Sequence, residues 1–195
     1  KMSFQALREA GYDVRLLNIM EPSESESWNP LELAIDYAFD GDWDNVNTEL
    51  SKVVQVIGGS AGEETTHKDI WDSAAESTIR SVMLAVLDIA VRHQDKSMVT
   101  IANVLQFIND MSHFSDSEGD GLTKYINMLG TLPRTPVRNM IRLNASEYLS
   151  ATGDTKSSIS FSVMNRLNLF ASESITRLTS FNPINLTDLG FPRIL

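Results

Sequence analysis

The run VMLAVLDIAV, residues 82–91, is apolar at nine of its ten positions and carries one charge, at Asp88. A surface helix has one apolar stripe, whereas a helix that is apolar on all sides is buried in the core. The helical pattern around this run begins near Thr66 or Asp69 and continues to about His93. We therefore expect a long central helix, with the other elements of the chain packed around it.

Helical patterns lie on both sides of this central run. Periodic apolar residues bounded by caps, prolines and glycines predict further helices over Ser3–Ala10, Pro30–Phe39, Trp43–Ile57, Ser97–Met111, Leu122–Leu129, Pro136–Leu149 and Asp154–Leu178. The predicted fold class is therefore mainly α, a helical bundle of about seven to eight helices.

Two short segments near the ends of the chain have β character. YDVRLLNI, residues 12–19, alternates in polarity and predicts a short strand near the N-terminus. RIL, residues 193–195, predicts the start of a second strand at the C-terminal end. A helical bundle with β-structure at both edges suggests an insertion into an α/β domain rather than a self-contained fold.

The chain has a net charge of −10, and its charges are unevenly placed. Residues 1–120 carry eight Lys/Arg and 22 Asp/Glu, whereas residues 121–195 carry eight and four. No Lys or Arg lies between Arg15 and Lys52, where there are nine acids. Such a surface repels a phosphate backbone, so the first half favours a basic protein partner over DNA. The other interpretation is that the acids only keep the protein soluble.

The sequence contains no recognisable catalytic, metal or cofactor motif. There is no cysteine, which excludes disulfides and thiolate chemistry, and the three histidines are far apart. The glycine-rich loop at residues 58–62 lacks the Gly-Lys-Ser/Thr of a P-loop. The stretch KMSFQALREAGYDV, residues 1–14, lacks the apolar h-region of a signal peptide, and no apolar run is long enough to span a bilayer. We expect a cytoplasmic chain that acts by binding, is not itself an enzyme and holds no cofactor.

Candidate partner-contact residues lie in the acidic part of the sequence. Asp40, Asp42 and Asp44 alternate around Trp43, where one predicted helix ends and the next begins. Acids at a helix start also interact well with the positive end of its dipole, which is the local explanation for them. Two further candidates, Glu63 and Glu64, follow in the glycine-rich loop.

A structural junction is predicted within ESESWNPLEL, residues 24–33. Pro30 suits the first turn of a helix, where its missing N–H would have no partner, and Asn29 before it is a natural N-cap. Trp28, one position earlier, can pack against the first helical turn. We therefore expect Trp28, Asn29 and Pro30 to mark the start of the helical domain, with the Trp28 side chain buried.

The ordered string LREAGYDVRLLNIMEPSESESWNPLE, residues 7–32, resembles a passage in the type IV coupling proteins. These are the TraG/TraD-like hexameric ATPases of conjugation and type IV secretion. The matching positions are Gly11, Tyr12, Val14, Leu17, Asn18, Pro22, Ser25 and Trp28 to Leu31. Further along, Asp69, Ile70, Trp71 and Ala74 resemble a helix motif of the family, and INLTDLGFPRIL at residues 184–195 resembles the segment that leads to its Walker B strand.

The resemblance implies an all-α domain that interrupts a RecA-like nucleotide-binding domain. Residues 1–29 would connect the nucleotide-binding domain to the all-α domain of residues 30–180, and residues 181–195 would lead back. ATP and Mg would bind the full-length protein outside this chain. The full-length protein would be a homo-hexamer anchored to the bacterial cytoplasmic membrane.

The resemblance also implies a function in substrate recognition. The implied partners are a relaxase, relaxosome accessory proteins or secreted effectors, bound by protein–protein contact. A weak DNA contact through the basic last third of the chain is a further expectation. The alternative is a passive structural or oligomerisation insertion that makes no contact with substrate.

Overall fold

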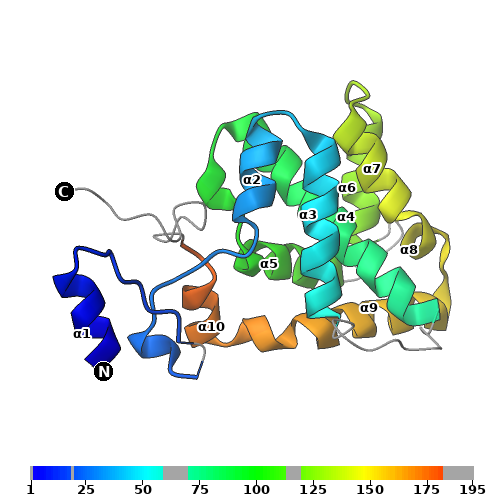
Figure 1. Cartoon of the computed structure of the whole chain (residues 1–195). Coiled ribbons are helices and arrows are strands. Elements are labelled where there is room, and N and C mark those ends of the chain that lie inside the picture. The colour runs from blue at the N-terminus through cyan, green and yellow to red at the C-terminus, as the bar shows by residue number, and fades with distance from the viewer. Residues whose placement is uncertain (1, 19, 59–69, 113–119, 182–195) are drawn as a thin grey trace.

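The helix α4 (Ile70–His93) is the axis of the fold. The computed structural model describes residues 2–18, 20–58, 70–112 and 120–181, and within them every residue from Ser81 to Asp88 is buried. Helices α3, α5, α7 and α9 pack around α4, which runs through the middle of the molecule (Figure 1). The Ser81 hydroxyl, which is also buried, donates to the carbonyl oxygen of Ile141 at 2.9 Å. The prediction of a buried central helix is confirmed.

The remaining elements are also helical. The α-helices are α1 (Met2–Glu9), α2 (Glu32–Phe39), α3 (Trp43–Ile57), α5 (Ile101–Ser112), α6 (Gly121–Gly130), α7 (Pro136–Asn144), α8 (Ser146–Ser150), α9 (Gly153–Leu167) and α10 (Glu173–Leu178). Short 3-10 helices are η1 (Pro22–Glu24), η2 (Lys96–Met98) and η4 (Asn168–Ala171). None of the described helices is both long enough and apolar enough to cross a membrane.

A tight turn joins α2 to α3 and makes them a helical hairpin that packs against α4. Gly41 ends the first helix with a backbone φ of +80°, a value that favours glycine because it lacks a Cβ atom. Asp42 then begins the second helix by accepting a hydrogen bond from the backbone N–H of Asn45 at 3.1 Å. In Figure 1 this turn is at the top of the molecule.

The predicted strand over residues 12–19 is wrong, because residues 12–18 are irregular and the described part of the chain contains no strand. A strand requires a neighbour whose backbone groups complete its hydrogen bonds. Here the Glu26 N–H donates to the Leu16 carbonyl at 2.9 Å, but the Asn18 N–H is bound by the Ser25 hydroxyl instead. The segment has β-like composition without a sheet to join among the described residues.

The second predicted strand, at residues 193–195, lies outside the described residues. The fold class is therefore corrected: a mainly α bundle was expected to have β-structure at its edges, and the described chain is helical only. The alternating composition of residues 12–18 did not produce a strand, because composition alone does not form one.

Two predicted helices are interrupted. The helix expected over Asp154–Leu178 is divided into α9, η4 and α10, because Ser172 has an extended backbone with φ −73° and ψ 139°. The Ser172 hydroxyl accepts a hydrogen bond from the Ile175 N–H at 3.4 Å and so caps α10. The helix expected over Pro136–Leu149 is likewise divided at Ala145 into α7 and α8.

Candidate functional site

The candidate site is an acidic surface on the α2–α3 hairpin, defined here by Asp36, Asp40 and Asp44. Asp36 and Asp40 are four residues apart and therefore lie on the same face of α2. Asp44 is in the first turn of α3, directly after the connecting turn. All three side chains are exposed, and the described residues provide no cation paired with Asp40 or Asp44.

Asp40 and Asp44 differ in their position relative to the helix dipoles. Asp40 is the C-cap of α2, at the negative end of that helix. Asp44, by contrast, is at the positive end of α3, where an acid is stabilising. Asp40 is therefore the acid of this surface whose position the helix dipoles do not explain.

Asp42, another predicted contact residue, is occupied by its role as a helix cap. Its carboxylate accepts from the Asn45 backbone N–H at 3.1 Å and from the Asn45 Nδ2 at 2.7 Å. The side-chain hydrogen bond from Asn45 lowers the pKa of Asp42 below its ordinary value of 3.8. Trp43 is half-buried and packs against the edge of the core. Both residues therefore shape the turn that presents Asp40 and Asp44.

The sequence predictions missed one acid and included two that lie outside the described residues. Asp36 is neutralised by Lys96, whose Nζ is 2.7 Å from Asp36 Oδ1 and 5.3 Å from the centre of the Phe39 ring. The spacing of four residues from Asp40 could have identified Asp36, whereas its partner is 60 residues away in sequence. Glu63 and Glu64 lie outside the described residues.

The predicted junction at Trp28, Asn29 and Pro30 joins three parts of the molecule. The Asn29 side chain is buried; its Oδ1 accepts from the Leu31 N–H at 3.0 Å and its Nδ2 donates to the Val99 carbonyl at 2.7 Å. Asn29 thus caps the turn that leads into α2, and that helix begins at Glu32 rather than at Pro30. The junction is fixed by an amide that bonds both to its own helix and to the loop before α5.

The Trp28 side chain was expected to be buried and is half-buried. Its backbone N–H donates to the Leu178 carbonyl at the end of α10, at 2.7 Å. Its indole Nε1 is enclosed, and the described residues offer it no hydrogen-bond acceptor. The segments that lead into and out of the bundle therefore meet at this residue.

The basic last third of the chain uses several of its cations inside the bundle. Arg166 of α9 pairs with two carboxylates of α4, Asp72 at 2.7 Å and Glu76 at 3.2 Å. Lys156, also in α9, pairs with the buried Asp120 at 2.5 Å. These side chains are only 11% and 16% exposed, so they are poorly placed to contact a nucleic acid.

A third buried group links α4 and α7. Asp88 of α4 lies 3.1 Å from Arg92 Nε and 3.6 Å from Arg138 Nε. Burial, followed by the charge of Asp88, raises the pKa of Tyr125 to about 12. Within the described ranges, no group of three or more histidines and acids is arranged to hold a metal ion. These charges accordingly join helices to one another.

Comparison with known proteins gives one match. Residues 1–194 match the model of a family described as type IV secretory system conjugative DNA transfer. Neither the search of curated proteins nor the search of solved structures gave a match.

Proposed function

Because this chain belongs to the type IV secretory system conjugative DNA transfer family, we propose that it is the substrate-recognition domain of a hexameric coupling ATPase. Its family places it in conjugative DNA transfer. In our proposal it binds a relaxase, a relaxosome accessory protein or a secreted effector by protein–protein contact. ATP and Mg bind elsewhere in the full-length protein, and this chain acts by recognition rather than catalysis.

The observation that carries this proposal is the unpaired acidic turn between α2 and α3. Three acids buried in the bundle, Glu76, Asp88 and Asp120, have cationic partners. Asp40 and Asp44 are exposed and have none among the described residues. A basic partner would neutralise both of these charges.

The ends of the bundle support the proposed connectors at residues 1–29 and 181–195. The incoming chain at Trp28 and the outgoing chain at Leu178 are joined by a backbone hydrogen bond of 2.7 Å. Adjacent ends suit a domain inserted into another, because the host chain can then continue past the insertion. Leu16 and Leu17, which precede the junction, are 45% and 43% exposed and offer apolar surface to a neighbouring domain.

Two further parts of the proposal concern location and DNA. We propose that the domain works on the cytoplasmic side of a full-length protein anchored to the bacterial cytoplasmic membrane. Any DNA contact through the last third of the chain would be weak. Arg134 is an exposed cation of that third for which the described residues show no carboxylate partner, and it is the best candidate for such a contact.

The competing proposal is a passive insertion that spaces the subunits of a ring. Three largely buried ion pairs between helices, Asp88–Arg138, Asp120–Lys156 and Glu76–Arg166, are compatible with this role, because they stiffen the bundle without presenting a binding surface. It does not explain why Asp40 remains unpaired at the C-terminus of α2. Recognition is therefore the function that the geometry favours.

The test is titration calorimetry of this chain with the purified relaxase and accessory proteins of its own relaxosome. The variant Asp40→Asn/Asp44→Asn should weaken binding by about tenfold at low salt. Rising NaCl should weaken binding of the unmodified chain more steeply than that of the variant, because salt screens the removed charges. The matched control, Glu147→Gln/Glu173→Gln, removes two exposed acids elsewhere and should bind normally.

Two results would contradict the proposal. Absence of binding by every relaxosome protein, with the helical circular dichroism spectrum intact, would remove the receptor function. Equal weakening by the variant and its control would show that binding follows net charge and does not depend on the α2–α3 turn.

A further inference from the structure

The N-terminal arm, defined as residues 2–28, lies beside the bundle rather than within it. Figure 1 shows α1 apart from the other helices, with the chain returning past α10 before it reaches α2. The large apolar side chains of the arm, Leu7, Tyr12, Leu16, Leu17 and Met20, are between 42% and 91% exposed. The position of the arm therefore depends on specific polar contacts, since its apolar residues do not bury themselves in the core.

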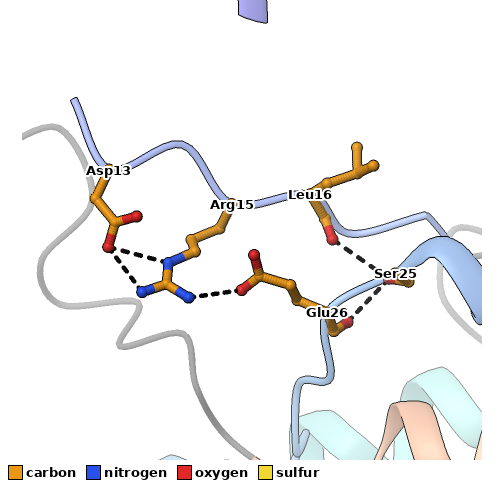
Figure 2. Close-up of polar contacts among 5 residues, drawn as sticks. All are labelled: Asp13, Arg15, Leu16, Ser25 and Glu26. Carbon is orange, nitrogen blue, oxygen red and sulfur yellow. Dashed lines mark hydrogen bonds and ion pairs between the residues drawn. The ribbon is translucent and has the colours of Figure 1, made fainter. Parts of the chain in front are cut away.

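The arm is braced by its own side chains, as Figure 2 shows. The Arg15 guanidinium bridges Asp13 at 2.8 Å and Glu26 at 3.0 Å. The Ser25 hydroxyl accepts from the Asn18 N–H at 2.8 Å and lies within hydrogen-bonding distance of the carbonyl oxygens of Leu16 and Glu26. These contacts close residues 13–26 into a loop, so that this part of the arm moves as one piece.

Two hydrogen bonds attach the N-terminal arm to α10. Arg177 Nη2 donates to the Pro22 carbonyl oxygen in η1 at 2.7 Å. The Trp28 N–H donates to the Leu178 carbonyl oxygen, also at 2.7 Å. The donor and acceptor residues of α10 are consecutive, so both bonds are made by the last turn of one short helix.

The two bonds differ in what surrounds them. Leu178 is buried, and Trp28 is followed directly by the buried Asn29, whose side chain is bound to Val99. Arg177 is exposed and reaches the arm only through its flexible side chain. The Trp28–Leu178 bond is therefore held in place by buried neighbours. The bond from Arg177 to Pro22, by contrast, can break without unfolding the bundle.

We propose that the hydrogen bond from Arg177 to the Pro22 carbonyl is a clasp that sets the angle of the N-terminal arm on the helical bundle, with the Trp28–Leu178 bond and Asn29 as the pivot. Closed, the clasp makes the arm and α10 one rigid unit. Helix α10 contacts η4, and η4 contacts α5 and α9. The angle of the arm is therefore linked through α10 and η4 to α5 and α9. Release of Arg177 frees the braced loop to swing as a lever.

The clasp can be tested by measuring a distance across it. The chain has no cysteine, so spin labels at Leu7→Cys in α1 and Val56→Cys in α3 report on the arm without background. With Arg177 intact, electron–electron double resonance should give one narrow distance distribution. Arg177→Met keeps the aliphatic stem but removes the donor, and should broaden or shift that distribution. The control Arg134→Met removes an exposed cation away from the arm and should leave it unchanged.

A second readout separates clasp opening from loss of stability. Hydrogen exchange at the Trp28 amide should stay slow in Arg177→Met, because the Trp28–Leu178 bond is the pivot and does not depend on Arg177. Amides in the middle of α4 should also exchange as before. An unchanged distance distribution in Arg177→Met would overturn the proposal. So would faster exchange at both Trp28 and α4, which would mean global destabilisation.

Discussion

Asp120 shows how one residue can fix two parts of the bundle. Its carboxylate caps α6 by accepting from the Thr123 N–H at 3.0 Å, and it pairs with Lys156 of α9 at 2.5 Å. Burial acts most strongly and would raise the pKa of Asp120. The hydrogen bond and charge of Lys156, together with the Thr123 bonds, outweigh it, so the pKa is lowered. The ionised form is therefore the form that stabilises the fold.

This shift gives a prediction with a defined sign. A carboxyl whose pKa is lower in the folded protein than in the unfolded chain contributes stability above its unfolded pKa. That contribution is lost as the pH falls through the lower, folded value. Asp120→Asn should lower the free energy of unfolding by about 2–3 kcal/mol at pH 7. Urea denaturation should show the gap between the two proteins closing below about pH 4. An equal difference in the free energy of unfolding between the two proteins at pH 7 and at pH 3 would contradict a lowered pKa for Asp120.

For single residues, the sequence predicts contacts between close neighbours in the chain but misses contacts between residues far apart in the chain. The helix start at Trp43 and the N-cap candidate Asn29 could be recognised from their immediate neighbours, because capping acts within three residues. Lys156, which neutralises Asp120, lies 36 residues further along the chain and could not be assigned to it. The acids left over for binding were therefore known only once the internal pairs were seen.

Among the elements, α4 was the most predictable, because its composition is compatible only with a central, buried position. A helix that is apolar on all sides cannot face water, so it must be central. The strand over residues 12–19 was wrong for the opposite reason. An alternating segment becomes a strand only when it pairs with a second strand. In the described chain this segment has one backbone hydrogen bond, from Glu26 to Leu16, and a hydrogen bond from Asn18 to the Ser25 hydroxyl. The interruption at Ser172 was also missed, since one extended residue scarcely disturbs helical periodicity.

The central position of α4 can be tested with a single truncation. Leu87 is fully buried, so Leu87→Ala leaves a cavity that the surrounding helices cannot fill. We expect its free energy of unfolding to fall by about 2–5 kcal/mol, with an unchanged dependence on urea concentration. Leu143→Ala is the matched control, because Leu143 is 74% exposed. It should change stability by less than about 0.5 kcal/mol. A loss of similar size in both variants would contradict the assigned core.

For the molecule as a whole, the charge on the surface cannot be read from the charge totals of the sequence, because some opposite charges pair with one another inside the fold. Two of the eight cations in residues 121–195, Arg138 and Arg166, lie opposite negative charge in the first 120 residues, across the contacts of α4 with α7 and α9. The sequence showed the imbalance, but only the fold shows which charges cancel. The charge that remains exposed on the α2–α3 hairpin is acidic.

The acidic surface and the clasp are in different places on the molecule. In Figure 1 the turn between α2 and α3 is at the top, whereas the arm and α10 are at the lower left. A partner could therefore occupy the acidic surface while the arm and α10 stay joined. This separation allows recognition and the attachment of the bundle to be altered independently by mutation.

The most direct test of the proposed receptor function is conjugative transfer by the full-length protein carrying Asp40→Asn/Asp44→Asn. We expect the frequency of DNA transfer to fall, while ATPase activity and hexamer formation match those of the unmodified protein. The control Glu147→Gln/Glu173→Gln should transfer DNA normally. Unchanged transfer by the Asp40/Asp44 variant would contradict the proposed receptor function, and loss of transfer together with the hexamer would support the passive insertion instead.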